Sequence, residues 1–100
     1  MTDSLKGYWI AHVDVGDPDG YKSYVAANGV AFAKFNGRFL VRGTPQEVVE
    51  GHVKSRTIVI EFPSLEAAKA CYNCDEYQAA KALRAPVSDC DLTIIEGWLG

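Results

Sequence analysis

Residues 56–64 read Arg-Thr-Ile-Val-Ile-Glu-Phe-Pro-Ser, and this stretch decides the fold. Its centre, residues 58–60, consists of β-branched side chains, which favour a strand. Because the run is apolar at both alternating positions, it is typical of a central strand covered on both faces. Pro63 ends the hydrogen-bonded ladder, and Ser64 can cap a following helix. The stretch therefore predicts a central strand that leads directly into a helix.

The composition describes a small acidic domain of 100 residues, of which 48% are hydrophobic and 23% charged. This length fits one globular domain over residues 1–100 and excludes a second. The formal net charge is -3 and the 10 basic residues are scattered, which argues against nucleic acid as a partner. The N-terminus shows neither a signal-peptide pattern nor an apolar run near the ~20 residues of a membrane span. We therefore expect a cytoplasmic protein with no membrane partner.

Residue periodicity predicts the order strand, helix, strand, strand, helix, strand. The strands are expected at residues 6–15, 38–42, within 56–64, and at 92–99. The helices are expected at residues 18–35, 65–72 and 75–84, the last two being parts of one broken helical region in which Asp75 starts a capping box. Residues 43–54 read as a hairpin arm or flap between strands.

This order in one small domain indicates the ferredoxin-like plan of the α+β class. We expect a four-stranded antiparallel sheet with the first and third strands at its centre and both helices on one face. The other face would carry Leu40, Val59 and Ile10 along with polar groups. Leaving such apolar surface in water is unfavourable by about 25 cal/mol per Å². A homodimer in which two sheet faces meet is therefore expected.

Several segments resemble one known family over nearly the whole chain. They are Gly7-Tyr8-Trp9-Ile10, Gly37 to Gly43, Glu47 to Gly51 and Ile60 to Ser64, with Tyr72 and Tyr77 after them. These segments resemble the bacterial "thirteen-thirty" family of domains of unknown function. That family is similar to the dimeric α+β barrel superfamily, which includes small monooxygenases, isomerases, dehalogenase-like and heme-handling members. The resemblance implies a cytoplasmic homodimer and implies no particular activity.

His12, Asp14 and Arg42 are the candidate catalytic residues. Arg42 ends the second strand beside the start of the third, so the three side chains can converge on one rim of the sheet. An arginine can bind a carboxylate bidentately, and a histidine with a pKa near ~6.5 can move a proton at neutral pH. The structural alternative is that Arg42 pairs with Asp14 or Glu50 and that His12 is a satisfied sheet residue. Glu61 lies more than about 10 Å from His12 in this arrangement, too far for an acid-base pair.

The predicted second strand is expected to alternate regularly. Phe39 and Val41 would face one way, while Arg38, Leu40 and Arg42 would face the other.

A second set of residues is predicted to contact a ligand. It consists of Tyr8, Tyr24, Asn28, Arg38, Glu61 and Tyr77. Each has a structural alternative: the tyrosines can be core or dimer surface, Asn28 can bond to neighbouring backbone, and Glu61 can form an ion pair with Arg38 or Arg56.

Cys71 and Cys74 have the spacing of redox and metal sites, but no second Cys or His pair accompanies them. We interpret them as buried or incidental thiols, and we expect neither a metal nor a cofactor. Two functional hypotheses remain open. One is a small-molecule pocket, with cofactor-independent catalysis on a small anionic or aromatic metabolite. The other is a non-catalytic ligand-binding or protein-interaction module.

Overall fold

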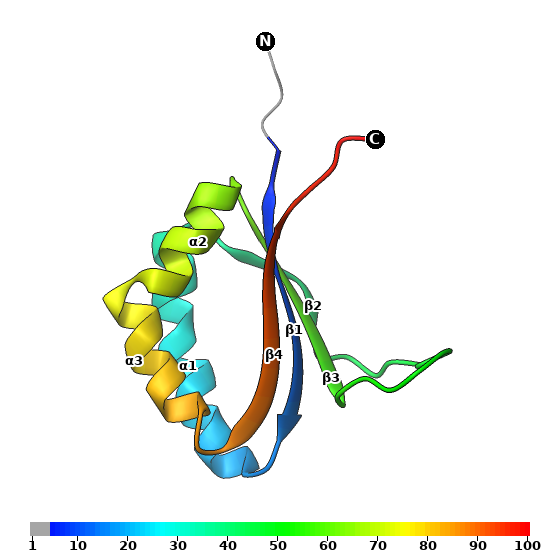
Figure 1. Ribbon diagram of the computed structural model, residues 1–100. Coiled ribbons are helices and arrows are strands. Elements are labelled where there is room, and N and C mark those ends of the chain that lie inside the picture. The colour runs from blue at the N-terminus through cyan, green and yellow to red at the C-terminus, as the bar shows by residue number, and fades with distance from the viewer. Residues whose placement is uncertain (1–4) are drawn as a thin grey trace.

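The computed structural model describes residues 5–100 as one sheet with helices on one side (Figure 1). The strands are β1 (Gly7–Val15), β2 (Arg38–Arg42), β3 (Arg56–Phe62) and β4 (Ser88–Glu96). The helices are α1 (Pro18–Lys34), α2 (Leu65–Asn73) and α3 (Asp75–Arg84). All neighbouring strands are antiparallel, in the order β2-β3-β1-β4. The predicted ferredoxin-like α+β plan, with the first and third strands at the centre, is confirmed.

Local caps explain where the first two helices begin and end. α1 begins where the Asp17 carboxylate accepts a hydrogen bond from the Gly20 N–H, at 3.2 Å, and it ends before Asn36, which has a left-handed φ of 58°. α2 begins where the Ser64 hydroxyl accepts the Ala67 N–H at 3.1 Å. The sequence predictions for these boundaries are confirmed to within a residue or two.

The start of α3 differs from the prediction. Cys74, rather than Asp75, is the N-cap, and its Sγ accepts the Tyr77 N–H at 3.3 Å. Asp75 is instead the first helical residue, where its charge favours the positive end of the helix dipole. A thiol is an uncommon cap, which is why the residue-type rules pointed to Asp75.

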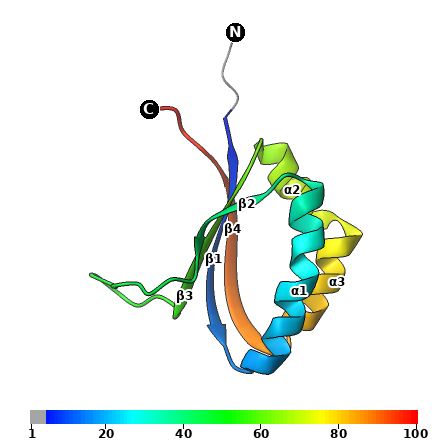
Figure 2. The ribbon, with the colours of Figure 1, turned by 180° about the vertical axis from the view of Figure 1, so that it is seen from behind.

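The bounds of β4 differ from the prediction. β4 spans residues 88–96 instead of 92–99, because its polar first half pairs with the end of β1. The predicted arm is present: residues 43–55 contain no strand and extend from the sheet, on the side opposite the helices (Figures 1 and 2). The arm therefore extends the face of the sheet that the helices leave uncovered.

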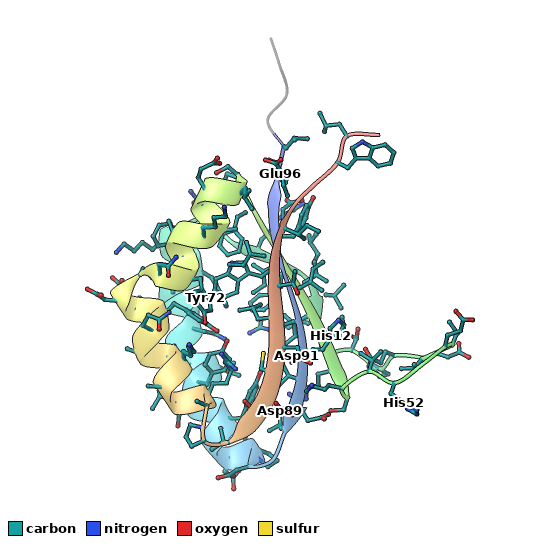
Figure 3. The ribbon with its side chains drawn as sticks, viewed as in Figure 1. His12, His52, Tyr72, Asp89, Asp91 and Glu96 are labelled. Carbon is teal, nitrogen blue, oxygen red and sulfur yellow. The ribbon has the colours of Figure 1, made fainter. Side chains whose placement is uncertain are left out.

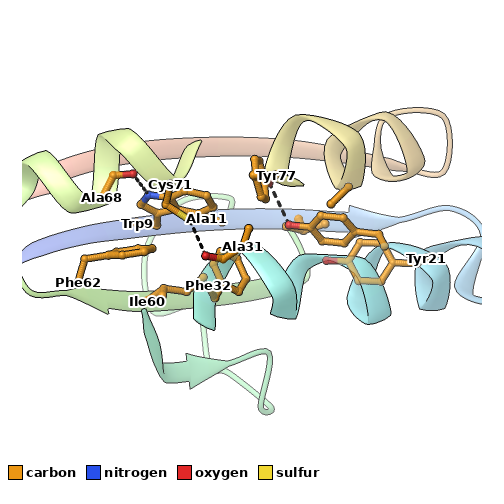
Figure 4. Close-up of a cluster of buried hydrophobic side chains, with 13 residues drawn as sticks. Trp9, Ala11, Tyr21, Ala31, Phe32, Ile60, Phe62, Ala68, Cys71 and Tyr77 are labelled. Atoms are coloured by element: carbon orange, nitrogen blue, oxygen red, sulfur yellow. Dashed lines mark hydrogen bonds between the residues drawn. The ribbon is translucent and has the colours of Figure 1, made fainter. Parts of the chain in front are cut away.

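The helices cover one face of the sheet, and the largest buried side chains lie between them and it (Figure 4). Trp9 is central: its indole N–H donates to the Ala68 carbonyl at 2.8 Å, and its ring meets Phe32 and Tyr77 edge-on, with centroids 5.2 and 4.8 Å away. Such aromatic contacts dominate the energetics of small cores.

Alternation along β1 defines the two faces used below. The covered face carries Trp9, Ala11 and Val13 of this strand, all buried. The open face carries Tyr8, Ile10, His12 and Asp14, which are half-buried or exposed.

Across residues 5–100, none of the helices combines the length and apolar character that a membrane crossing requires.

Candidate functional site

A cavity of about 240 Å³ lies between the covered face of the sheet and helices α1 and α3. Its apolar walls include Trp9, Phe32, Phe39, Ile58, Ile60 and Leu92. A dry apolar cavity of roughly 150 Å³ is known to hold one benzene ring. The volume therefore suits a molecule with one substituted ring better than a fused polycyclic one.

Three arginines line this cavity: Arg42 at the end of β2, Arg56 at the start of β3, and Arg84 at the end of α3. Within residues 5–100, no acidic side chain lines the cavity, and the ion pairs do not involve these three arginines. Arginine stays protonated in proteins. The cavity therefore holds positive charge without a counter-charge in largely apolar surroundings, which favours an anionic ligand.

Arg84 is the most deeply buried of the three, with 8% of its surface exposed. Its guanidinium carbon lies 5.6 Å from the centroid of the Tyr24 ring. Its Nε–H is buried and has no hydrogen-bond partner in the part of the chain that the structure describes. An unpaired buried donor on a charged group is costly, and native proteins keep few of them. The Nε–H therefore lacks the partner that a buried charged donor normally has.

Two tyrosine hydroxyls of the cavity lining form a hydrogen bond, which is the dashed line at Tyr77 in Figure 4. The Tyr24 and Tyr77 oxygens are 3.0 Å apart, so one phenol donates a hydrogen bond to the other. Burial raises the pKa of both phenols above the usual value of 10.0, while Arg84 acts in the opposite direction on each. Both are therefore protonated at neutral pH. The phenol that accepts within the pair keeps its own hydrogen, which it can donate elsewhere.

Asn28 lies one helical turn after Tyr24 on α1 and has 6% of its surface exposed. It lines the cavity, as does Cys90 of β4. Burial raises the pKa of the Cys90 thiol, so this group also stays protonated at neutral pH. The cavity lining in the described chain therefore contains donors and neutral groups and no side chain that is a base at neutral pH.

The more exposed end of the cavity, called the mouth below, is formed by Arg42, Gly43 and Arg56. The Arg42 guanidinium carbon lies 4.2 Å from the Phe39 ring centroid, and that of Arg56 lies 5.6 Å from the Tyr21 centroid. Stacking on aromatic rings orients both cations. They stand where an incoming anion would first meet the cavity.

A β-bulge in β2 places Arg42 at this mouth. The register with β3 shifts between Phe39 and Val41, so Leu40 is an extra residue without a partner. Beyond it, Arg42 is opposite Ile58, which lines the cavity. The prediction that Arg42 faces away from Phe39, together with Leu40, is wrong because a bulge resets the alternation of a strand.

His12 (Figure 3) and Asp14 lie on the open face, whereas Arg42 lines the cavity on the covered face, so the structure does not bring the three together. His12 Nδ1 is 3.2 Å from the Thr57 hydroxyl oxygen. Asp14 accepts the Ser55 N–H at 2.8 Å, and this hydrogen bond lowers the pKa of its carboxyl. The prediction that these three side chains converge on one rim of the sheet is therefore wrong. A catalytic role for each of them stays a prediction.

The six predicted ligand contacts divide between the two faces. Those that line the cavity are Tyr24, Asn28 and Tyr77, and those on the open face are Tyr8, Arg38 and Glu61. Glu61 accepts hydrogen bonds from the Tyr8 hydroxyl at 3.1 Å and from Arg38 Nε at 3.0 Å. The hydrogen bond from Arg38 lowers the pKa of Glu61. The anticipated Glu61–Arg38 ion pair is therefore present, and it satisfies both charges.

Sequence reasoning missed Tyr21, Arg56 and Arg84 as cavity residues. Arg84 follows Tyr77 by seven residues, which is two helical turns, so the two share one face of α3. A cation on the same helix face as a buried aromatic residue is a signal that could have revealed it. Arg56 has no such signal, because it stands at the beginning of a strand.

The cysteines and acids offer little to a metal. Among residues 5–100, no group of three or more His, Cys, Asp or Glu side chains is arranged to hold a metal ion. Burial raises the pKa of the Cys71 thiol to about 12, and Cys74 serves as the cap of α3. The interpretation of Cys71 as a buried thiol agrees with this environment.

The sheet, the helices on one face and the order of the elements define a ferredoxin-like α+β protein. Within that class, the chain belongs to the family described as a domain of unknown function, DUF1330, which matches residues 6–98. The family resemblance of the sequence segments is confirmed. None of the curated proteins matches the chain.

Solved structures with this fold have low sequence identity to the chain. A protein of unknown function from Rhodopseudomonas palustris is 18% identical, with a TM-score of 0.73 over 97% of this chain and 85% of its own. SnoaB from Streptomyces nogalater, described as a cofactor-independent oxygenase, is 13% identical, with a TM-score of 0.64 over 97% of both chains. A dimeric ferredoxin-like protein of unknown function from Thermobifida fusca is 16% identical, with a TM-score of 0.62 over 99% of this chain and 95% of its own.

Proposed function

We propose that the cavity binds a small anion that carries a single aromatic ring. The observation that supports this is the charge of the lining: three arginines, with no acid among the described lining residues, on otherwise apolar walls. A ligand carboxylate would supply the missing counter-charge through charge-assisted hydrogen bonds. The ring would be buried by the aromatic walls, and the volume of about 240 Å³ limits it to one ring.

A thermal-shift comparison of benzoate with benzamide tests this proposal, because the two molecules have nearly the same shape and differ in charge. Benzoate at 100 times its Kd should add about 2.7 kcal/mol of stability, and benzamide should add much less. Arg42→Met and Arg56→Met should each reduce the shift, most at low salt, because they remove exposed cations. If no small aromatic carboxylate stabilises the wild-type protein, the proposal must be abandoned.

We also propose that two copies associate through their open faces. Ile10 and Val59 are opposite each other there, and Val41 and Ile95 on the same face are 39% and 48% exposed. This apolar surface is a reason for association, and the Thermobifida fusca neighbour is described as dimeric. Light scattering should give about twice the chain mass of 10.9 kDa. A monomeric mass at micromolar concentration would reject the dimer.

Cofactor-independent oxygenation is the second candidate, and it is supported by the fold likeness to SnoaB. Because the tyrosines of the cavity are protonated and its described lining lacks a carboxylate and an imidazole, the substrate would have to enter already ionised. A dihydroxybenzoate assayed at alkaline pH, where part of it carries a phenolate, is a suitable probe, since electron-rich phenolate rings react directly with dioxygen. Oxygen uptake should be faster with wild type than with Arg84→Met. Equal rates of oxygen uptake in the two proteins would reject catalysis at this cavity and leave only ligand binding.

A further inference from the structure

We propose that Arg84, together with the Tyr24–Tyr77 hydroxyl pair, receives the carboxylate of the ligand, which enters the cavity with its charged end first. This inference rests on the proposed function and deepens it, because it assigns the orientation of the ligand and the residue that recognises it. The ligand class is then a monocyclic aromatic carboxylic acid whose ring points back towards the mouth.

The first argument is that Arg84 has no acidic partner within residues 5–100. Two other cations are paired with acids: Arg38 with Glu61 at 3.0 Å and Lys34 with Glu76 at 3.0 Å. Arg84 is more deeply buried than either of these, yet its Nε–H has no partner within the described chain. A cation kept for stability would be paired, since an unpaired buried charge destabilises the fold. The arrangement is explained if a ligand supplies the partner.

The second argument is the number of donors. Arg84 offers its Nε–H, and the phenol pair offers the one hydroxyl hydrogen that is not used between Tyr24 and Tyr77. The fork of N–H donors on the Arg84 guanidinium and this one hydroxyl can together hold the two oxygens of a carboxylate. Because burial raises the pKa of both phenols, neither loses its hydrogen at neutral pH.

The third argument is the position of the remaining arginines. Arg42 and Arg56 lie at the exposed mouth, where water competes for an anion, and both are already stacked on aromatic rings. Between the mouth and Arg84 the walls are aromatic, which suits a ring and not a charge. A second acidic group opposite the first would therefore reach the mouth arginines. Terephthalate should bind more tightly than benzoate, whereas phthalate, with adjacent carboxylates, should bind more weakly.

Calorimetric titration of benzoate into wild type, Arg84→Met and Arg84→Lys tests the assignment. Arg84→Met should weaken binding by roughly 10- to 100-fold, the range expected when one charged hydrogen bond is removed. Arg84→Lys should recover part of the affinity, because it restores charge without the planar fork. The unliganded Arg84→Met protein should melt at the same temperature as wild type or higher, because the change removes a buried charge that lacks a partner.

Tyr77→Phe is the second variant, because it keeps the ring and removes one hydroxyl. It should weaken benzoate binding by about 3- to 10-fold. This variant tests the same carboxylate position if Arg84→Met fails to fold. Unchanged benzoate affinity in both variants, with weaker binding in Arg42→Met, would overturn this inference and leave the proposed function in place. Absence of benzoate binding to wild type would overturn both.

Discussion

The two faces of the sheet both carry charged side chains, but only those of the open face are paired with one another. On that face Glu61 joins Tyr8 and Arg38, and Lys54 contacts Asp91 at 2.5 Å. On the covered face, the arginines of the cavity have no acidic partner within the described chain. Internal pairing satisfies a charge, whereas an unpaired charge in an apolar cavity is available to a ligand. Whether a charged residue binds a ligand or serves the fold is therefore better judged from its partners than from its residue type.

The two faces should differ most in how much the truncation of a side chain lowers the free energy of unfolding. Trp9→Ala on the covered face should cost about 3–5 kcal/mol, because it removes a buried ring and its hydrogen bond to Ala68. Ile10→Ala, on the open face, should cost less than about 2 kcal/mol in the monomer, because Ile10 is only half-buried in one chain. Urea denaturation at a protein concentration low enough to keep the chains monomeric measures both. Equal losses would contradict the distinction between the faces.

A charge placed on the open face should separate self-association from ligand binding. Val59→Lys should weaken the proposed dimer by about 3 kcal/mol, because it would bury an unpaired ammonium between two sheets. Its benzoate affinity should stay within about twofold of wild type, since Val59 does not line the cavity. Light scattering and calorimetry measure the two properties.

Val30→Lys is the matched control for that variant, because Val30 is 61% exposed on α1. It should keep the wild-type mass. If Val59→Lys also stays dimeric, the copies associate through a surface other than the open face.

The fold could be predicted from the sequence because its determinants are local. Residues 56–64 contain the sequence signals for a strand, for its end and for a helix cap. Asp17 is likewise the signal for the start of α1. The candidate site could not be predicted to the same depth, because its placement depends on contacts between distant segments. Leu40 is recognised as an extra residue only when β2 is paired with β3. The residue pattern of β2 alone therefore places Arg42 on the wrong face. The burial of Arg84 likewise depends on how α3 packs beside α1.

The open-face ion pair should give a small, pH-dependent effect. The hydrogen bond from Arg38 lowers the pKa of Glu61 below 4.5, so the folded protein favours the carboxylate form. Its stabilising contribution is then complete above the unfolded pKa and is lost as pH falls through the lower folded pKa. Glu61→Gln should therefore be less stable than wild type at pH 7, and the difference should vanish at strongly acidic pH.

Denaturation at several pH values measures this difference. Glu50→Gln on the exposed arm is the control, because Glu50 forms no ion pair in the described part of the chain. A difference between Glu61→Gln and wild type that persists below the folded pKa would mean that packing, and not charge, is the source of the effect.

Benzoate binding, by contrast, should show no pH dependence between pH 6 and 8. Each ionisable group that lines the cavity keeps one protonation state in this range, because arginine remains charged and burial raises the pKa of the phenols and the thiol. These groups are Arg42, Arg56, Arg84, Tyr21 with a pKa of about 12, Tyr24, Tyr77 and Cys90. Calorimetry at constant ionic strength measures the affinity. An affinity that changes with pH in this range would contradict the prediction and would mean that a group outside the cavity lining acts on the ligand.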